Sequence, residues 1–227
     1  MGALRQVVHA DETGWRENGK NGYSWSFSTP QERCLLFGRR TKDLVDRGVG
    51  PDVAGVLVTD FYAAYDHYPG EHQRCWAHLL RDIHDLRQHY PQEVPVRRWA
   101  RRIHRLYRTA TRLPGAGMAA RERLERALLQ VVAPFAQDLA APQRVLSKRV
   151  VDYLEELFVF VGNPAVPPDN NAAERSIRPL VTGRKVSGGT RAAEGTATRM
   201  TLATLFGTWR VRGLNPFLAC RHMLTSP

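Results

Sequence analysis

Three carboxylates, Asp11, Asp60 and Glu174, stand at positions from which they could share a metal ion. Asp11 ends a short segment that begins at Gln6, Asp60 ends the apolar run 53–58, and Glu174 lies at the start of a predicted helix. Neighbouring strands lie about 4.8 Å apart, so acids that end two adjacent strands can reach one cation. Carboxylate oxygens are the ligands that Mg²⁺ prefers, with substrate phosphates and water completing its shell. The pattern favours a magnesium site on a protein that handles phosphate esters.

Each acid also has a structural interpretation. Asp11 or Asp60 could form a turn at the end of a strand, and Asp169 could cap a helix. Glu174 could complete a capping box with Asn171 or pair with Arg178 one turn later. Spacing alone leaves both interpretations open for every one of these acids.

The segment that contains Asp11 is predicted to belong to an antiparallel meander. The steps Asn18-Gly19 and Asn21-Gly22 supply residues that favour tight hairpin turns. Aromatic residues then alternate with serines over residues 23–28, which places three rings on one face of a sheet and three hydroxyls on the other. A third strand is predicted at 34–37. A buried strand over 53–58, beside the first strand, then gives a mixed sheet.

The rest of the chain is predicted to be mainly helical. A short helix is expected at 41–47, a short fifth strand near Arg74 and Cys75, and a helix from Trp76 to Tyr90. Further helices are expected at 94–112, 118–133, 143–161, 196–211 and 216–224, the last with Asn215 as its N-cap, and a glycine-rich basic loop at 183–191. The predicted class is therefore α/β, with a mixed five-stranded sheet, an all-helical insertion and C-terminal helices. The predicted domains are 1–90, the first part of the core, 91–166, the insertion, and 167–227, the second part of the core with the C-terminal helices.

The charge of the chain indicates a polyanionic partner. Its formal net charge is +11, and only four of its 33 basic residues are lysines. The guanidinium of arginine matches phosphate oxygens with two parallel hydrogen bonds, so nucleic acid is the first partner to consider. A GC-rich genome that favours arginine codons would give the same composition.

The predicted helix 94–112 concentrates this charge. Arg97, Arg101, Arg105, Arg108 and Arg112 share one helical face, Arg98 and Arg102 add two further charges, and the apolar residues lie opposite. Phosphates would neutralise this face and release counterions, so we expect DNA contact. The alternative is a solvated helix, or one that pairs with acids such as Glu122 and Glu125.

Two other groups of residues could support a different chemistry. His72, Cys75 and His78 are three residues apart, but no fourth zinc ligand is evident; Cys75 and His78 are expected to pack beneath the sheet, with His78 near enough to support the acids. Tyr62 and Tyr65 could act as covalent nucleophiles, although aromatic core is the favoured role.

The chain is expected in a reducing cytoplasm. Its three cysteines are widely spaced and form no CxxC pair. No apolar segment typical of a signal peptide is present, and no run approaches the roughly 18 uncharged residues needed to span a bilayer.

Several short motifs resemble the insertion sequence 66 family of bacterial transposases. They occur in the family's order along nearly the whole chain: DETGW at 11–15, TDFYAAYD at 59–66, QRCWAHLLRD at 73–82, NNAAERSIRP at 170–179, RKVSGGTR at 184–191 and LFGTWR at 205–210. The resemblance implies a ribonuclease H-like core with an Asp-Asp-Glu triad, whose positions match Asp11, Asp60 and Glu174. Relatives usually carry a leucine-zipper-like helix and a zinc-binding segment that are not recognisable here, so a truncated or excised form is expected.

The resemblance also implies a mechanism and its partners. Two Mg²⁺ or Mn²⁺ ions, held by the triad, would assist cleavage at transposon ends and strand transfer into target DNA by a homo-oligomer in the bacterial cytoplasm, associated with the nucleoid. The alternatives are a ribonuclease H-like nuclease or resolvase that cuts without joining, and an inactive DNA-binding remnant. The residues expected to contact DNA are Arg97, Arg98, Arg101, Arg102, Arg105, Arg108, Arg112, Arg175, Arg178, Arg184, Lys185 and Arg191.

Overall fold

A mixed five-stranded sheet with helices confirms the expected α/β class. The structure is a computed structural model and describes residues 7–50 and 55–225; Gln6 and residues 53–54 of the predicted strands lie outside the described residues. The chain divides into two compact units, one formed by Met1–Gly70 with Asn170–Pro227 and the other by Glu71–Asp169. The second unit thus begins twenty residues before the predicted insertion, and the predicted domain boundaries stay a prediction.

The first unit contains four strands and four α-helices within the described residues. The strands are β1 (Val7–Glu17), β2 (Lys20–Ser28), β3 (Arg33–Gly38) and β4 (Val56–Thr59); the helices are α1 (Lys42–Val49), α7 (Asn171–Ser187), α8 (Ala193–Val211) and α9 (Pro216–Thr225), with a 3₁₀ turn η1 (Ala63–Tyr65). The strand order is β3-β2-β1-β4. Strands β1 and β2, and β2 and β3, are antiparallel, whereas β1 and β4 are parallel, with His9 opposite Val58. The expected neighbourhood of the first and fourth strands is confirmed.

The first strand is longer than predicted. Its pairing with β2 runs without interruption from His9 to Glu17, with Asp11 opposite Ser26, so the prediction that the strand ends at Asp11 is wrong. Polar residues continue the strand because the hairpin supplies a partner for each of them. The turn uses only the first Asn-Gly step: Asn18 and Gly19 have φ angles of 48° and 74°, as this kind of tight turn requires. Asn21 and Gly22 instead lie within β2.

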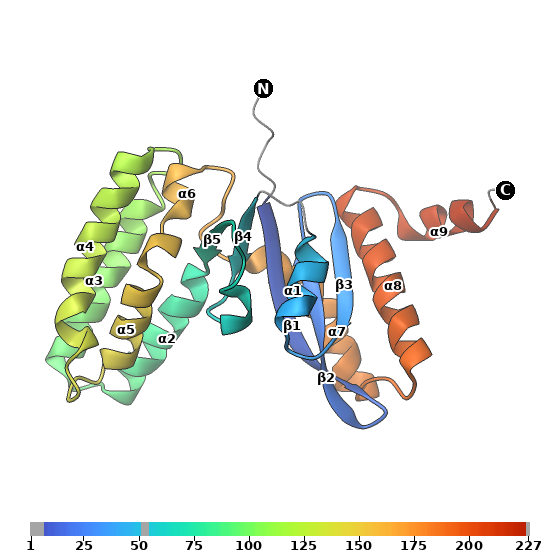
Figure 1. The fold of residues 1–227 in the computed structure, drawn as a ribbon, viewed down its shortest axis with the longest axis horizontal. Coiled ribbons are helices and arrows are strands. Elements are labelled where there is room, and N and C mark those ends of the chain that lie inside the picture. Colours follow the sequence, from blue (N-terminus) through green and yellow to red (C-terminus); the bar gives the residue numbers. More distant parts are fainter. Residues whose placement is uncertain (1–6, 51–54, 226–227) are drawn as a thin grey trace. The chain divides into compact units, whose positions relative to one another are not determined.

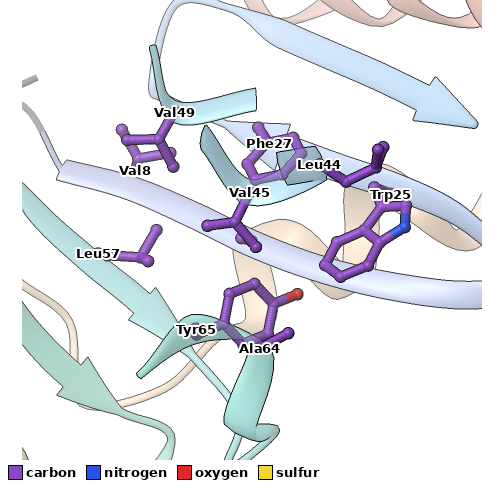
Figure 2. Packing of buried hydrophobic residues seen from close by; sticks show 10 residues of the cluster. Val8, Trp25, Phe27, Leu44, Val45, Val49, Leu57, Ala64 and Tyr65 are labelled. Atoms are coloured by element: carbon purple, nitrogen blue, oxygen red, sulfur yellow. The ribbon is translucent and has the colours of Figure 1, made fainter. Parts of the chain in front are cut away.

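The two faces of the sheet have different compositions. Trp25 and Phe27 of β2 pack with Val8 and Ala10 of β1, against α1 and residues of β4 and η1, as Figure 2 shows for this cluster. The serines of β2, at positions 24, 26 and 28, are buried on the opposite face. The predicted alternation of rings and hydroxyls is therefore confirmed.

Helices α7 and α8 cover the serine face of the sheet, and α1 covers the other (Figure 1). Trp15 and Leu35 meet Ile177, Leu180 and Met200 there in a second hydrophobic cluster. Two polar contacts cross the same interface, from Ser24 Oγ to Met200 Sδ at 3.6 Å and from Ser26 Oγ to Ser176 Oγ at 2.9 Å.

Helix α7 replaces part of the predicted basic loop. The helix continues to Ser187 and stops at Gly188, whose φ of 71° is left-handed. Glycine adopts this conformation without the steric cost that a Cβ atom brings, which makes it a strong helix terminator. The prediction of a loop is therefore wrong for residues 183–187.

The second unit consists of one strand and a set of helices within the described residues. Its elements are β5 (Glu71–Arg74), α2 (Trp76–His89), α3 (Val94–Ala110), α4 (Met118–Ala136), α5 (Arg144–Asp152), the 3₁₀ turn η2 (Leu154–Glu156) and α6 (Val159–Gly162). Helices α3, α4 and α5 run side by side (Figure 1). The predicted helices at 76–90, 94–112 and 118–133 are confirmed to within a few residues.

The prediction of a single helix over 143–161 is wrong, because this segment forms three separate elements, α5, η2 and α6. The side-chain amide of Gln73 donates to the Leu157 carbonyl at 3.2 Å and accepts from the Phe160 amide at 3.1 Å. The indole of Trp76 also donates to Leu157. Buried side chains thus satisfy backbone groups that a continuous helix would have paired internally.

No helix in the described part of the chain is long and apolar enough to cross a bilayer.

Candidate active site

Asp11 lies on the face of β1 that α7 covers. His9, two residues before it, contacts the residue that precedes α7, and Thr13, two residues after it, accepts a hydrogen bond from Arg184 of α7 at 3.1 Å. Alternate residues of a strand share one face, so Asp11 points to the same side. Its Oδ1 accepts a hydrogen bond from the Glu12 amide at 2.9 Å.

Other acids surround Asp11. Burial, then the negative charges of Glu12 and Asp60 and, more weakly, of Glu174, raise the pKa of Asp11 to about 7, against the opposing effect of the Glu12 amide. Burial and like charges both disfavour the ionised carboxylate. The structure therefore brings Asp60 and Glu174 into electrostatic range of Asp11.

Asp60 follows the last residue of β4, as predicted. Its Oδ1 accepts a hydrogen bond from the Tyr62 amide at 2.9 Å, a local turn of the kind that aspartate forms readily. Because β4 is parallel to β1 and pairs with it, Asp60 leaves the sheet beside the strand that carries Asp11.

Glu174 lies in the first turn of α7, where its amide donates to the Asn170 carbonyl at 3.2 Å. A carboxylate at this position is stabilised by the helix dipole. The N-cap of α7 is Asn170, so the alternative that Asp169 caps this helix is wrong. The side chain of Asn170 makes no capping hydrogen bond to the helix.

Asn170 was not identified from the sequence, although it holds α7 against β1. Its side-chain amide donates to the Ala10 carbonyl at 2.7 Å, and its carbonyl oxygen lies 3.1 Å from His9 Nδ1. Both His9 and Asn170 are buried. The only signal in the sequence was the pair of asparagines shortly before Glu174; nothing in the pattern pointed to a partner 160 residues away.

Glu12, beside Asp11 in sequence, has a structural role on the opposite face of β1. Its side chain is 2% exposed, and its carboxylate accepts hydrogen bonds from Tyr65 Oη at 2.7 Å and Arg40 Nε at 3.1 Å and forms an ion pair with Arg40. The Arg40 guanidinium also lies 3.9 Å from the centre of the Tyr62 ring. Burial and Glu12 raise the pKa of Tyr65 well above its ordinary value, which disfavours a tyrosinate nucleophile at this position.

Among residues 7–50 and 55–225, no three or more His, Cys, Asp or Glu side chains are grouped closely enough to hold a metal ion. The three acids are therefore in electrostatic range without forming a ligand cage. The alternative zinc set, His72, Cys75 and His78, is likewise not gathered. Cys75 is buried and His78 lies on α2, both in the second unit, and their support of the acids stays a prediction.

The cationic face predicted for the helix at 94–112 is present on α3. Arg98, Arg101, Arg102, Arg105 and Arg108 of α3 are exposed, as is Arg112 in the turn that follows the helix, and Arg97 is half-buried, whereas Trp99, Ile103 and Ala110 are buried. Four of these arginines, with Arg87 of α2 and His104, line a hollow of about 410 Å³. Glu122 pairs with Arg126 and Glu125 with Arg121, so the alternative that these acids neutralise α3 is wrong.

The basic residues of the first unit divide into exposed and anchored side chains. Arg175, Arg178, Lys185 and Arg191 are exposed. Arg184 is half-buried and donates to Thr13 and to the Gly14 carbonyl, so it fixes the end of α7 to β1.

A mixed sheet with acids on β1, after β4 and on the helix that returns from a helical insertion defines an α/β domain of the ribonuclease H-like class. The model of the transposase IS66 family matches residues 3–198, and the chain belongs to this family. The family resemblance seen in the sequence motifs is thereby confirmed.

A relative gives a partial match. The uncharacterized protein y4jO of Sinorhizobium fredii (strain NBRC 101917 / NGR234) is 31% identical over 150 residues, which cover 64% of this chain and 46% of the relative. The match therefore spans less than half the length of that relative.

Proposed function

We propose that the chain is the catalytic domain of a DNA transposase that cleaves transposon ends and joins them to target DNA. Asp11, Asp60 and Glu174 are the catalytic acids in this proposal. The observation that carries it is that the charges of Asp60, which follows β4, and of Glu174, on α7, both raise the pKa of Asp11 on β1, in a member of a transposase family.

The donor chemistry of these acids fits Mg²⁺ or Mn²⁺. All three offer oxygen atoms only, and the repulsion that raises the pKa of Asp11 would be relieved by a positive charge among them. Because the three side chains are not grouped as ligands in this structure, they would have to draw together to hold an ion. Two divalent ions would supply an activated nucleophile and stabilise the leaving oxygen at a DNA phosphodiester.

The residues of the chain hold and position the reacting groups. Asn170 and Ser176 fix α7 to the sheet, which keeps Glu174 beside β1, and the pairing of β4 with β1 keeps Asp60 there. Attack by water breaks a phosphodiester bond and leaves a 3′ hydroxyl. In the joining step this hydroxyl attacks a target phosphodiester; one P–O bond forms, another breaks, and the leaving oxygen takes a proton.

DNA is the proposed partner of the basic surfaces. The exposed arginines of α3 carry no neutralising acid from α4, so phosphates would be attracted to this helix. Action by a homo-oligomer on paired DNA ends in the bacterial cytoplasm belongs to the same proposal.

The test is a cleavage and joining assay with labelled duplex DNA that carries transposon ends. With Mg²⁺, wild-type protein and an Asp43→Asn variant, which removes an exposed acid of α1, should give joined products. Asp60→Asn should give none while binding DNA as well as or better than wild type, because a repulsive charge is lost. Cleavage retained by Asp60→Asn would refute the assignment. Cleavage without joining would indicate a nuclease or resolvase, and binding alone an inactive remnant.

A further inference from the structure

A groove in the first unit lies outside the acidic site. It is bounded by β3, α7 and α8 and has a volume of about 760 Å³. Leu35, Leu180, Leu202, Ala203 and Phe206 contribute an apolar lining, and Leu202 and Phe206 remain 42% and 37% exposed. An apolar hollow of this size is typical of a ligand site.

The charged residues of the groove are all cationic, and its other polar residues are Ser176, Thr190 and Thr198. Arg33, Arg175, Arg199 and Arg210 line it, and no aspartate or glutamate does. Burial and, to a smaller extent, the positive charge of Arg175 lower the pKa of Arg33, and both side chains line the groove. An anion between them would relieve this repulsion. The occupant that fits the groove therefore combines an apolar part with a negative charge.

An aromatic ring in the lining narrows the class of ligand. Phe206 packs on Trp209 with ring centres 5.6 Å apart, so its ring is held in place while part of it faces the groove. A cationic groove with an aromatic platform is the arrangement with which proteins bind single-stranded nucleic acid, because every base has a face that can stack. The bases of a duplex are already stacked on each other and are not available to such a ring.

The groove and the acidic site share helix α7. Arg175, at the rim of the groove, directly follows Glu174 in the first turn of that helix. We infer that the groove binds unpaired nucleotides of a DNA strand, with bases against Phe206 and Leu202 and phosphates on Arg33 and Arg175. This inference rests on the proposed function, since the bound strand is the one to be cut or transferred.

Binding of short labelled oligonucleotides tests the inference. The probes are a deoxythymidine decamer and an abasic decamer with the same number of phosphates, measured by fluorescence anisotropy at fixed salt. Wild-type protein should bind the thymidine decamer at least about fivefold more tightly than the abasic one, because one stacked base contributes that much. Phe206→Ala should remove this difference. Arg175→Gln should weaken the binding of both probes more than Arg178→Gln, a matched exposed arginine of α7 outside the groove.

A variant whose side chain fills the groove provides a second, independent test of binding. Gly195 lines the groove, and a Cβ atom added there meets nothing within 4 Å, so Gly195→Met should fold and occupy the space. Methionine also has a higher helix propensity than glycine. Gly195→Met should reduce binding of the thymidine decamer, whereas Thr201→Met, on an exposed part of α8 outside the groove, should not.

The result can fail independently of the proposed function. Equal affinity of wild-type protein for the two decamers would overturn the inference, even if DNA is cleaved. So would an affinity for the thymidine decamer that neither Phe206→Ala nor Gly195→Met changes. Either result would indicate that the groove binds a protein partner. A base-dependent affinity that these variants abolish would support it, even if no cleavage is found.

Discussion

The side-chain amide of Asn170 donates a hydrogen bond to the backbone carbonyl of Ala10 at 2.7 Å. This contact joins the residue before α7 to the residue before Asp11, across 160 positions of sequence. The same side chain also contacts the ring of His9. The relative position of Asp11 and Glu174 therefore depends on a buried amide that has no catalytic chemistry of its own.

Replacing Asn170 should lower both stability and activity. Asn170→Ala leaves the Ala10 carbonyl buried without its donor, which should cost about 1–3 kcal/mol of the free energy of unfolding, measured in urea. DNA cleavage should fall further than duplex binding does, because Glu174 loses its anchor. Asn21→Ala, at an exposed contact in β2, should change the stability by less than about 0.5 kcal/mol. Equal effects of the two variants would contradict the role of Asn170.

The pKa of Asp11 predicts how stability depends on pH. The pKa is about 7 in the folded chain against the ordinary value of 3.8, so between these pH values the folded state holds a proton that the unfolded state has released. The contribution is fully present below about pH 3.8 and is lost as pH rises through 7. Without divalent ions, Asp11→Asn should therefore gain stability relative to wild type between pH 5 and pH 8. The free energy of unfolding of each protein is measured in urea at pH 5 and at pH 8. A difference between the two proteins that is the same at both pH values would contradict this expectation.

Divalent ions should offset the loss of stability that ionised Asp11 causes at high pH. At pH 8, Mg²⁺ should raise the melting temperature of wild type more than that of Asp11→Asn, because a ligand that binds only the folded state stabilises it. Equal shifts for the two proteins would place the ion elsewhere.

The neighbouring acid should behave as a structural residue. Glu12→Gln keeps the shape of the side chain but removes the charge that Arg40 and Tyr65 contact, which should cost about 2–4 kcal/mol in the free energy of unfolding. Glu17→Gln, at the end of the same strand, serves as the control and should have little effect. Loss of cleavage by folded Glu12→Gln at unchanged stability would instead give Glu12 a chemical role.

The arginines of α3 should control the salt dependence of DNA binding. Replacing Arg101 and Arg105 by Ala should weaken duplex binding irrespective of sequence and reduce the slope of log K against log salt by about 2, roughly one for each lost phosphate contact. Arg123 and Arg126 on α4 provide a matched control pair. A slope unchanged by the α3 substitutions would mean that this face is only solvated.

The sequence predicted the elements whose pattern repeats locally. The alternation around Trp25 and the apolar run before Asp60 were sufficient to predict the sheet and which of its strands are neighbours. The spacing of the arginines was sufficient to predict the exposed face of α3. The motifs identified Glu174 through family resemblance. Features that depend on partners distant in sequence were missed. They are the extension of β1 beyond Asp11, the helix breaks around Leu157, and the anchoring of α7 by Asn170. At Leu157, the side chains of Gln73 and Trp76 donate hydrogen bonds to the backbone carbonyl. Such contacts leave no local periodicity in the residues that make them.

The division of the chain has a consequence for its synthesis. The second unit is continuous, from Glu71 to Asp169, whereas the first needs residues from both sides of it. As the ribosome emits the chain in order, β1 and β2 must wait for α7 and α8, and Trp15 and Leu35 stay uncovered until Ile177, Leu180 and Met200 have emerged. A nascent chain that stalls before α7 would display these side chains to chaperones and proteases.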